Sequence, residues 1–416
     1  MLLMHLLASL LTITVIPGPT NQVQDPAIVA AEASFQAGDL AGAAKQCRAI
    51  LSGQPDRADV LHLLGKVSFI AAKSIGEFSK SLQAYGESEW AFRRLLQIAP
   101  QRDETRIEQT LAVCAQQRGA SLQAMTYAKR ATILGPRNSN AFRLLGECSS
   151  DLGQTAEAIE ALLTSLEIDP TNVDVVWLLA NEYNEAKKPH MAIALISKTL
   201  ANYSLDSKSS TTLYQLLYDS HLASNDSISA LSAIENVVRI DAKNARGAIE
   251  YASSLYRLSR FEEARKAALH ARSLQVMDST LLAIIALKLG QLLMHEQKYP
   301  EAIAEFRISL QEDPTDLSAL QSLAGALRRV GEEEQARSIL KHYRQVRAAR
   351  ENLEKNRILY RSQPQNQSAQ EKIIRALITL GRLDEAGKQL ELRQRKFPDN
   401  PSQSELIRLM AESKSK

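Results

Sequence analysis

The sequence predicts an all-α protein built as a solenoid of about ten helix–turn–helix repeats. Three observations predict it: a repeat period of about 34 residues, glycine-containing turn signals inside the units, and prolines at several unit ends. Pro136 and Pro170 are one period apart, and so are Ala230 and Ala264 in units without the proline. A chain of 416 residues would otherwise suggest about three globular domains, but one shared period favours a single array.

Composition limits the class of protein further. Lys and Arg total 50 against 47 Asp and Glu, and a net charge of +3 gives no reason to expect nucleic-acid binding from composition. The three cysteines exclude a disulfide scaffold and a multi-zinc protein. Cys114 and Cys148 are one period apart and therefore occupy equivalent packing positions in neighbouring units, too far apart for a disulfide.

The N-terminal segment is apolar over residues 1–16 and ends at Pro17-Gly18-Pro19. As a helix it would span about 24 Å, short for a hydrocarbon core of ~30 Å. We therefore predict that residues 1–20 form an export signal or a short membrane anchor, with a buried capping helix or a misassigned start as alternatives. The absence of Lys or Arg before the run weighs against a signal. A signal would place the protein in the periplasm or cell envelope; otherwise it is expected in the cytoplasm.

Each repeat is predicted to contain two amphipathic helices. The first ends at a glycine such as Gly153, which tolerates the left-handed conformation of a helix cap. Acidic residues such as Glu262 and Glu263 open the second helix and suit the positive end of its dipole. Small residues, Gly146 and Ala158 in one unit, allow the two helices to cross closely. A proline after the second helix prevents it from continuing.

The predicted solenoid spans residues 24–400, with three departures from the period. About 11 extra residues fall within 68–87, and a long basic helix covers about 334–361. Residues 401–416 have one apolar and one charged face and are predicted to form a C-terminal capping helix, which repeat arrays need for solubility. The units end near residues 55, 100, 136, 170, 204, 242, 276, 314, 350 and 398.

This pattern resembles the tetratricopeptide repeat, a helix–turn–helix unit of about 34 residues with small residues at the crossing and a terminal proline. The best copies are residues 140–170, 283–314 and 367–398. The resemblance implies a right-handed superhelix that is not an enzyme, needs no cofactor, and binds peptide segments or partner proteins in its concave groove.

The motifs of catalysis and metal binding were sought without success. His295 and Glu296 begin like a metalloprotease helix, but Tyr299 occupies the place of the second histidine. The sequence has no phosphate loop ending in Gly-Lys-Ser/Thr and no Gly-x-Ser-x-Gly elbow. The seven histidines have spacings unrelated to metal binding. We therefore predict no enzymatic activity, no cofactor and no metal.

Side chains on the first helices that stacking does not use are predicted to line the groove. Asn181 and Asn184 share one helix face, and amides that donate and accept together can hold a peptide backbone. Trp177, one turn earlier, adds an aromatic platform. The alternative is an ordinary solvated face. The candidate residues are Arg106, Gln109, Asn140, Arg143, Trp177, Asn181 and Asn184; Gln116, Glu147, Asp174, Gln215 and Asp219 are expected on the same side.

Known ligand classes of the family are not matched. One chaperone-binding subgroup clamps a C-terminal carboxylate with lysine and asparagine, but the corresponding places here hold Arg143, Glu147 and Leu178. Glu147 would repel a carboxylate. A long asparagine ladder, as in sugar-transferring relatives, is not matched either, because Asn181 and Asn184 do not recur in neighbouring units.

A second candidate surface is the basic stripe Arg337, Lys341, Arg344 and Arg347, whose spacings of 4, 3 and 3 put the four side chains on one side of a helix. Phosphates or anionic lipid headgroups would be attracted there. Neighbouring glutamates, including Glu351, offset part of the charge, so a solvated helix is the competing interpretation.

The leading functional hypothesis is a non-enzymatic scaffold that binds peptide segments or partner proteins, within an exported or cell-envelope assembly. A first alternative is a recruitment subunit for a separately encoded enzyme such as a transferase. A second alternative is an adaptor to anionic lipid or nucleic acid through residues 337–361. Nucleic acid is not the expected partner, and any membrane contact is expected only through the N-terminal segment.

Overall fold

The computed structural model describes residues 25–100, 104–274, 278–363, 365–397 and 401–414. Within these ranges the secondary structure consists of 21 α-helices, without a strand, so the predicted all-α solenoid is confirmed. The predicted leader, residues 1–20, lies outside the described residues. Contacts divide the chain after Lys187 into an N-terminal body and a C-terminal body. Each is described by itself below.

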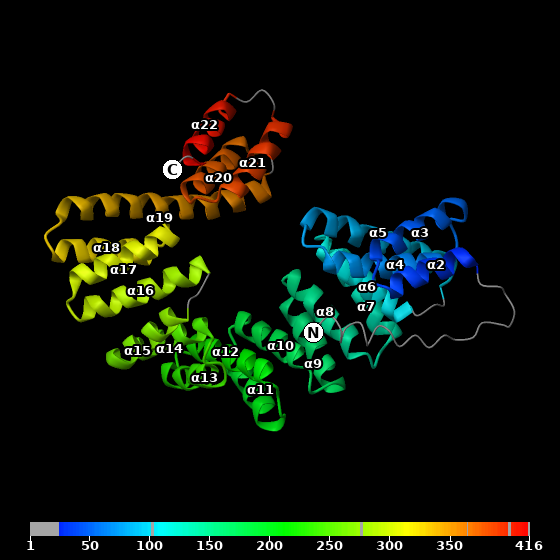
Figure 1. The fold of residues 1–416 in the computed structure, drawn as a ribbon, viewed down its shortest axis with the longest axis horizontal. Coiled ribbons are helices and arrows are strands. Elements are labelled where there is room, and N and C mark those ends of the chain that lie inside the picture. Colours follow the sequence, from blue (N-terminus) through cyan, green and yellow to red (C-terminus); the bar gives the residue numbers. More distant parts are fainter. Residues whose placement is uncertain (1–24, 101–103, 275–277, 364, 398–400, 415–416) are drawn as a thin grey trace. The chain divides into compact units, whose positions relative to one another are not determined.

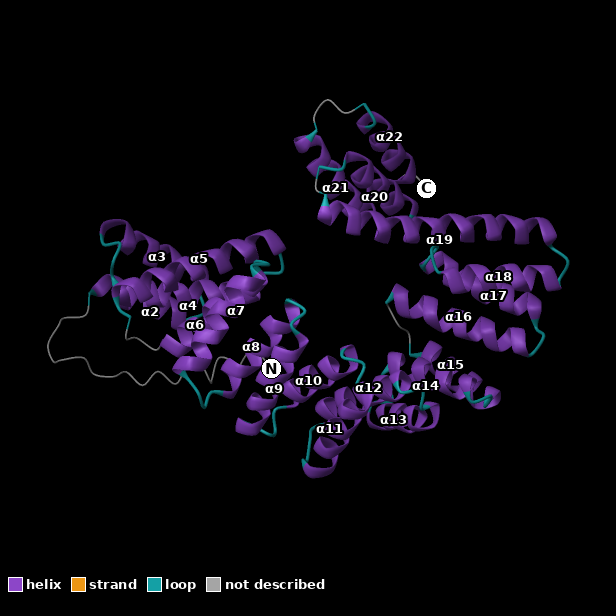
Figure 2. Cartoon of the chain, turned by 180° about the vertical axis from the view of Figure 1, so that it is seen from behind, coloured by secondary structure: helices purple, strands orange, loops and turns teal. Residues whose placement is uncertain are grey.

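The described part of the N-terminal body contains four helix pairs followed by a single first helix (Figures 1 and 2). Its elements are α2 (Pro26–Gln36), α3 (Leu40–Gly53), α4 (Ala58–Ser74), α5 (Phe78–Ile98), α6 (Glu104–Gln117), α7 (Ser121–Leu134), α8 (Ser139–Asp151), α9 (Thr155–Ile168) and α10 (Val173–Glu185). Even-numbered helices are the first helices of the repeats, and odd-numbered helices are the second.

The C-terminal body begins with the second helix α11 (Pro189–Asn202), and its described residues continue with five pairs. These are α12 (Ser207–Ala223) with α13 (Ser227–Ile240), α14 (Ala245–Arg257) with α15 (Phe261–Ser273), α16 (Ser279–His295) with α17 (Tyr299–Glu312), α18 (Leu317–Arg329) with α19 (Glu333–Ser362), and α20 (Gln367–Thr379) with α21 (Leu383–Lys396). A last helix, α22 (Gln403–Lys414), packs against α20 and α21.

The turns between paired helices need one residue in the left-handed region, except between α4 and α5, where no described turn residue has a positive φ. Gly153 (φ 71°) and Gly331 (φ 83°) supply it as predicted. Repeats without a glycine keep the same turn with other residues at φ 59–61°, namely Lys187, Asn225, Ser259 and Gln297. The turn is therefore imposed by the packing of the pair even where the residue does not favour it.

Eight of the described first helices begin at a capping residue that the repeat period does not reveal. Their side-chain oxygens accept a hydrogen bond from the first-turn backbone, which satisfies an otherwise unpaired N–H group. The caps are Asp25, Asn138, Asn172, Asp206, Asn244, Asp278, Asp316 and Asn366. An Asp or Asn at the start of these first helices was thus a readable boundary signal.

Close helix crossing explains the small residues. A Cβ atom on Gly146 would stand 2.6 Å from Cγ of Leu162, and one on Gly290 would stand 2.5 Å from the ring of Phe306. Ala158 and Ala302, on the partner helices, are fully buried. The crossings therefore pack a glycine against a large side chain of the second helix.

Neighbouring repeats stack mainly through the second helix of one repeat and the first helix of the next, and their first helices also touch. α2 packs on α4, α6 on α8 and α8 on α10, and in the C-terminal body α14 packs on α16 and α16 on α18. Second helices of neighbouring repeats make no comparable contacts in the described part of the chain. We call the side of the first helices that faces away from the second helices the inner face of each body.

Two of the three departures from the period lengthen helices, and the third adds the helix α22. The extra residues in 68–87 extend α4 to 17 and α5 to 21 residues, with a short turn between them. The basic helix α19 has 30 residues and packs first on α18 and then on α20 (Figure 1). The buried Arg393 holds α22 in place, donating to the Gln367 carbonyl at 2.6 Å and to Ser402 Oγ at 3.0 Å.

The cysteines and the hydrophobicity of the helices bear on two expectations from the sequence. All three cysteines, Cys47, Cys114 and Cys148, are free and buried. Among the described helices, none is both long and apolar enough to cross a membrane.

Candidate peptide-binding faces

The predicted groove residues lie on α6, α8 and α10 of the N-terminal body. Arg106 and Asn140 are exposed, whereas Gln109, Asn181 and Asn184 are partly buried. Because α8 packs directly on both α6 and α10, the predicted residues of these three helices are neighbours on one inner face. Polar bonds link them: Gln116 Nε2 donates to Asp151 Oδ2 at 2.7 Å, and Ser150 donates to the buried Glu182.

Trp177 is the aromatic centre of this face and is 43% exposed. The amide of Asn181 does not project beside it as a free donor, because Nδ2 donates to the Trp177 carbonyl of the same helix at 2.9 Å. In this conformation Asn181 offers its oxygen as an acceptor but does not offer donor and acceptor together. The indole, more than the two amides, is what this face presents to a ligand.

Arg143 is not an unpaired cation on this face. It forms an ion pair with Glu147, one turn later on α8. Burial raises the pKa of Glu147, Arg143 opposes this, and the charges of Asp151 and Asp174 raise the pKa further. The carboxylates around Arg143 therefore outnumber it, and this part of the inner face is acidic.

Lys73 was missed by the sequence reasoning. It stands in the last turn of α4, with Nζ 4.6 Å from the centre of the Phe69 ring. Burial lowers its pKa first, and the charge of Arg143 lowers it further. Lys73 thus adds a cation within electrostatic range of the predicted patch. The extension of α4 that positions it was the only sequence signal.

The predicted basic stripe occupies the solvent side of α19. Arg337, Lys341 and Arg344 are exposed, and in the part of the chain that is described none of them forms an ion pair. Arg347 Nε instead bonds Glu351 Oε1 at 2.9 Å. The opposite side of the helix is buried, with Ala336, Val346, Ala349 and Leu353 in the core. Three of the four predicted cations are therefore available to an anion.

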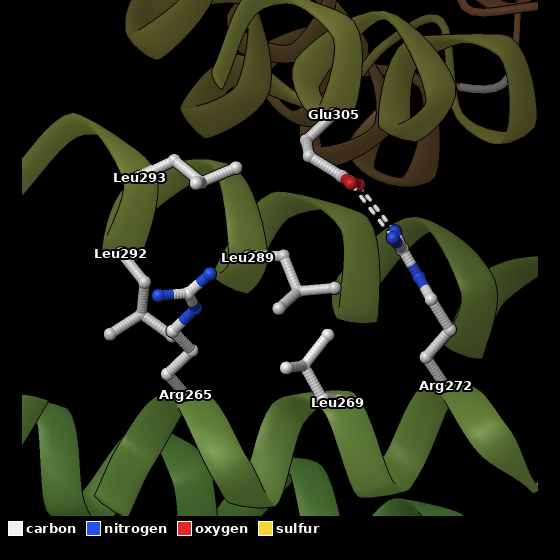
Figure 3. A pocket seen from close by; sticks show the side chains of 7 residues that line it. All are labelled: Arg265, Leu269, Arg272, Leu289, Leu292, Leu293 and Glu305. Atoms are coloured by element: carbon white, nitrogen blue, oxygen red, sulfur yellow. Dashed lines mark hydrogen bonds and ion pairs between the residues drawn. The ribbon is translucent and has the colours of Figure 1, made fainter. Parts of the chain in front are cut away.

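A small open pocket lies between α15, α16 and α17, on the side away from the inner face (Figure 3). It has a volume of about 190 Å³. Arg272 and Glu305 form a double ion pair across one end, with one of its bonds at 2.7 Å, and Arg265 stands at the other end. Its apolar lining is Leu269, Leu289, Leu292 and Leu293. The pocket can hold small apolar groups and contains no nucleophile.

Among the described residues, no three His, Cys, Asp or Glu side chains gather closely enough to hold a metal ion. The fold and these faces define an all-α helical-repeat array whose available chemistry is an exposed indole, polar stripes and charged patches. Such groups recognise the surface of another molecule.

A sequence model of the tetratricopeptide repeat family matches residues 142–172, which cover most of α8, the whole of α9 and the turns that follow each helix. The starts of α8, α10 and α12 follow one another at intervals of 34 residues, the period of that repeat. Residues 142–172 are thus similar to a tetratricopeptide repeat, and the all-α array in which they lie is consistent with a protein of that repeat family. Repeats of this family generally mediate protein or peptide interactions, and the proteins that carry them are generally non-enzymatic scaffolds.

Several solved structures are similar in fold. The C-terminal part of a repeat-containing protein from Cytophaga hutchinsonii is 17% identical, with a TM-score of 0.48 over 61% of this chain and 99% of that chain. A tetratricopeptide repeat protein from Parabacteroides merdae is 11% identical, with a TM-score of 0.45 over 64% and 98%. PilF from Pseudomonas aeruginosa is 18% identical, with a TM-score of 0.43 over 52% and 95%. No curated protein matches the sequence. These similarities carry no argument about function.

Proposed function

We propose that the protein is a non-enzymatic scaffold that binds extended peptide segments of partner proteins on the inner face of its N-terminal body. The observation that carries the proposal is Trp177, 43% exposed among polar side chains of three stacked first helices. A large, rigid and amphipathic ring at the centre of a polar face is typical of an interaction hot spot. The acidic surroundings of Glu147 favour peptides that bring a basic residue.

The two tryptophans of the chain allow a direct test. Trp90 lies on the second helix α5 and is 52% exposed, so it is a matched control for Trp177. Peptides would be selected from a random display library against the full chain. In the Trp90→Phe variant, Trp177 is the only tryptophan, and a selected peptide should shift its emission to shorter wavelength. In Trp177→Phe, the remaining Trp90 should not respond.

Affinity gives the second measurement. Trp177→Ala should weaken the binding of a selected peptide about tenfold or more, as expected for a central aromatic contact. Trp90→Ala should leave the affinity unchanged. An unaltered affinity for Trp177→Ala, with no response of the Trp177 emission, would show that peptides bind elsewhere or not at all.

The compartment is part of the proposal. An apolar run at residues 1–16 supports export to the periplasm or envelope. N-terminal sequencing of the mature protein tests it, because an export signal predicts a new N-terminus between residues 17 and 24. A mature protein that retains Met1 would contradict cleavage.

A second candidate function is supported by α19. Arg337, Lys341 and Arg344 are exposed without an ion pair among the described residues, so an anionic surface can approach them. Sedimentation with vesicles containing phosphatidylserine tests this function. Binding that falls steeply with added salt and is lost in Arg344→Glu would support it, whereas equal binding of the wild type to neutral vesicles would not.

A further inference from the structure

The inner face of the C-terminal body carries charged side chains on its first helices. On α14 these side chains recur at intervals of four, three and four residues, so they share one side of the helix. They are Arg246, Glu250, Ser253 and Arg257. The buried residues Ala248, Ile249, Ala252 and Leu255 occupy the other side. Asp219 on α12 and Lys288 on α16 flank this stripe.

Two carboxylates, Asp219 and Glu250, form what we call the acidic pole. Glu250 is fully engaged: Gln215 Nε2 donates to Oε2, and Arg246 Nε donates to Oε1 at 3.0 Å. Asp219 makes no ion pair or side-chain hydrogen bond within the described residues. Burial and the charge of Glu250 raise the pKa of Asp219 to about 6, and Arg246 only partly opposes them. The pole therefore holds one carboxylate more than it has cations.

Two cations, Arg257 and Lys288, form the basic pole. The Lys288 amine is partly buried and donates to Gln291 Oε1 at 3.2 Å, but neither cation forms an ion pair in the described residues. Burial lowers the pKa of Lys288, and the nearby charge of Arg257 lowers it further. Asp316 opposes this, yet its carboxylate already caps α18. The two like charges therefore form no direct ion pair among the described residues, and the charge of Asp316 only partly offsets them.

The spacing of the poles matches an extended peptide. Glu250 and Arg257 are seven residues apart on α14, which is about 10 Å along the helix axis. In a polyproline-type peptide, side chains three residues apart point to the same side and are separated by ~9 Å. Ser253 on α14 and Gln291 on α16 are polar. They suit a peptide backbone, whereas a docked helix would require apolar anchors.

We propose that the inner face of the C-terminal body binds an extended peptide that carries a basic and an acidic side chain three residues apart. The basic side chain pairs with Asp219 and Glu250, and the acidic one pairs with Arg257 and Lys288. The inference rests on the proposed function in one respect, that the ligand is a peptide. It assigns the peptide a separate site with its own sequence preference.

The test uses two fluorescein-labelled nonapeptides of identical composition, each with one lysine and one glutamate in a Ser/Pro background. In the first probe the two charges are three residues apart, and in the second they are adjacent. Fluorescence anisotropy with the full chain should show at least about fivefold tighter binding of the first probe, because only it reaches both poles. Equal affinities for the two probes would overturn the inference.

Protein variants identify the site. Lys288→Gln should remove most of the preference for the first probe. Lys266→Gln is the matched control, since it removes an exposed lysine from the second helix α15, and it should leave the preference intact. Equal effects of these two substitutions would overturn the assignment to the inner face.

A charge exchange separates binding from damage to the fold. Lys288→Glu should bind the first probe poorly but recover affinity for a probe in which lysine replaces the glutamate. No recovery would overturn the pairing of Lys288 with the acidic side chain. The Trp177 emission reports binding to the N-terminal body. If a probe changes this emission while the substitutions at Lys288 leave its affinity unchanged, this inference is refuted and the proposed function still stands.

Discussion

Two glycines in neighbouring first helices should respond to the same substitution with opposite signs. An alanine at Gly290 would put its Cβ 2.5, 2.7 and 3.0 Å from three atoms of the Phe306 ring, which is fully buried. Moving a whole packed ring belongs at the upper end of overpacking costs, about 3 kcal/mol. Alanine gains about 1 kcal/mol in helix propensity. The net expectation for Gly290→Ala is therefore a loss of about 2 kcal/mol.

At Gly325, in α18, a Cβ would meet no heavy atom within 4 Å. Only the propensity gain remains, so Gly325→Ala should stabilise by up to about 1 kcal/mol. Both variants would be compared with wild type by urea denaturation followed by circular dichroism. Hydrogen exchange would locate the effect, because repeat arrays transmit destabilisation mainly to neighbouring repeats. Faster exchange in α16 and α17 is expected only for Gly290→Ala. A stabilised Gly290→Ala, or equal losses in both variants, would refute the crossing argument.

Two further predictions concern buried and half-buried charges. Arg393→Met should release α22 and accelerate its hydrogen exchange, because the buried bonds to Gln367 and Ser402 disappear. The expected loss in the free energy of unfolding is roughly 3 kcal/mol. Arg408→Met, at an exposed position, is the control, and equal exchange of α22 in both variants would contradict the anchoring role of Arg393. The folded-state pKa of Asp219, about 6, lies above its ordinary value of 3.8, so the native state holds the proton more tightly and stability should fall as pH rises from about 4 to 6. Asp219→Asn should remove this pH dependence of stability and stabilise the protein at pH 7 by less than about 1 kcal/mol, since water reaches this exposed side chain and screens the repulsion. Melting temperatures measured between pH 4 and 7 test this. If the variant keeps the same pH dependence as the wild type, Asp219 is not the titrating group responsible.

The repeat period predicted the array because it records packing. Gly146 and Ala158 are small since two helices must cross there, and such a constraint repeats along the array. The turn could not be predicted as reliably, because Lys187 and Ser259 adopt the left-handed conformation without any sequence preference for it. Tertiary packing overrides the local cost at these positions.

The faces were predicted less well than the fold. Spacing alone correctly placed Trp177 and Lys341 on solvent-exposed sides of their helices. It did not reveal that Asn181 turns its amide back to its own helix, since that choice depends on side-chain rotation. The proximity of the Lys73 charge to that of Arg143 was also hidden, because it depends on how far α4 extends.

The charges of the inner faces are free to differ between the bodies because stacking does not use them. Near Arg143 the N-terminal face is acidic around an exposed indole, whereas along α14 the C-terminal face alternates between an acidic and a basic pole. Unpaired or like-charged groups cost free energy in the unliganded protein, and only a ligand of complementary charge relieves that cost. If both proposals hold, two differently charged faces on one repeating scaffold should select different peptides. If a single peptide bound both faces with equal affinity, the charges would have no role in its recognition.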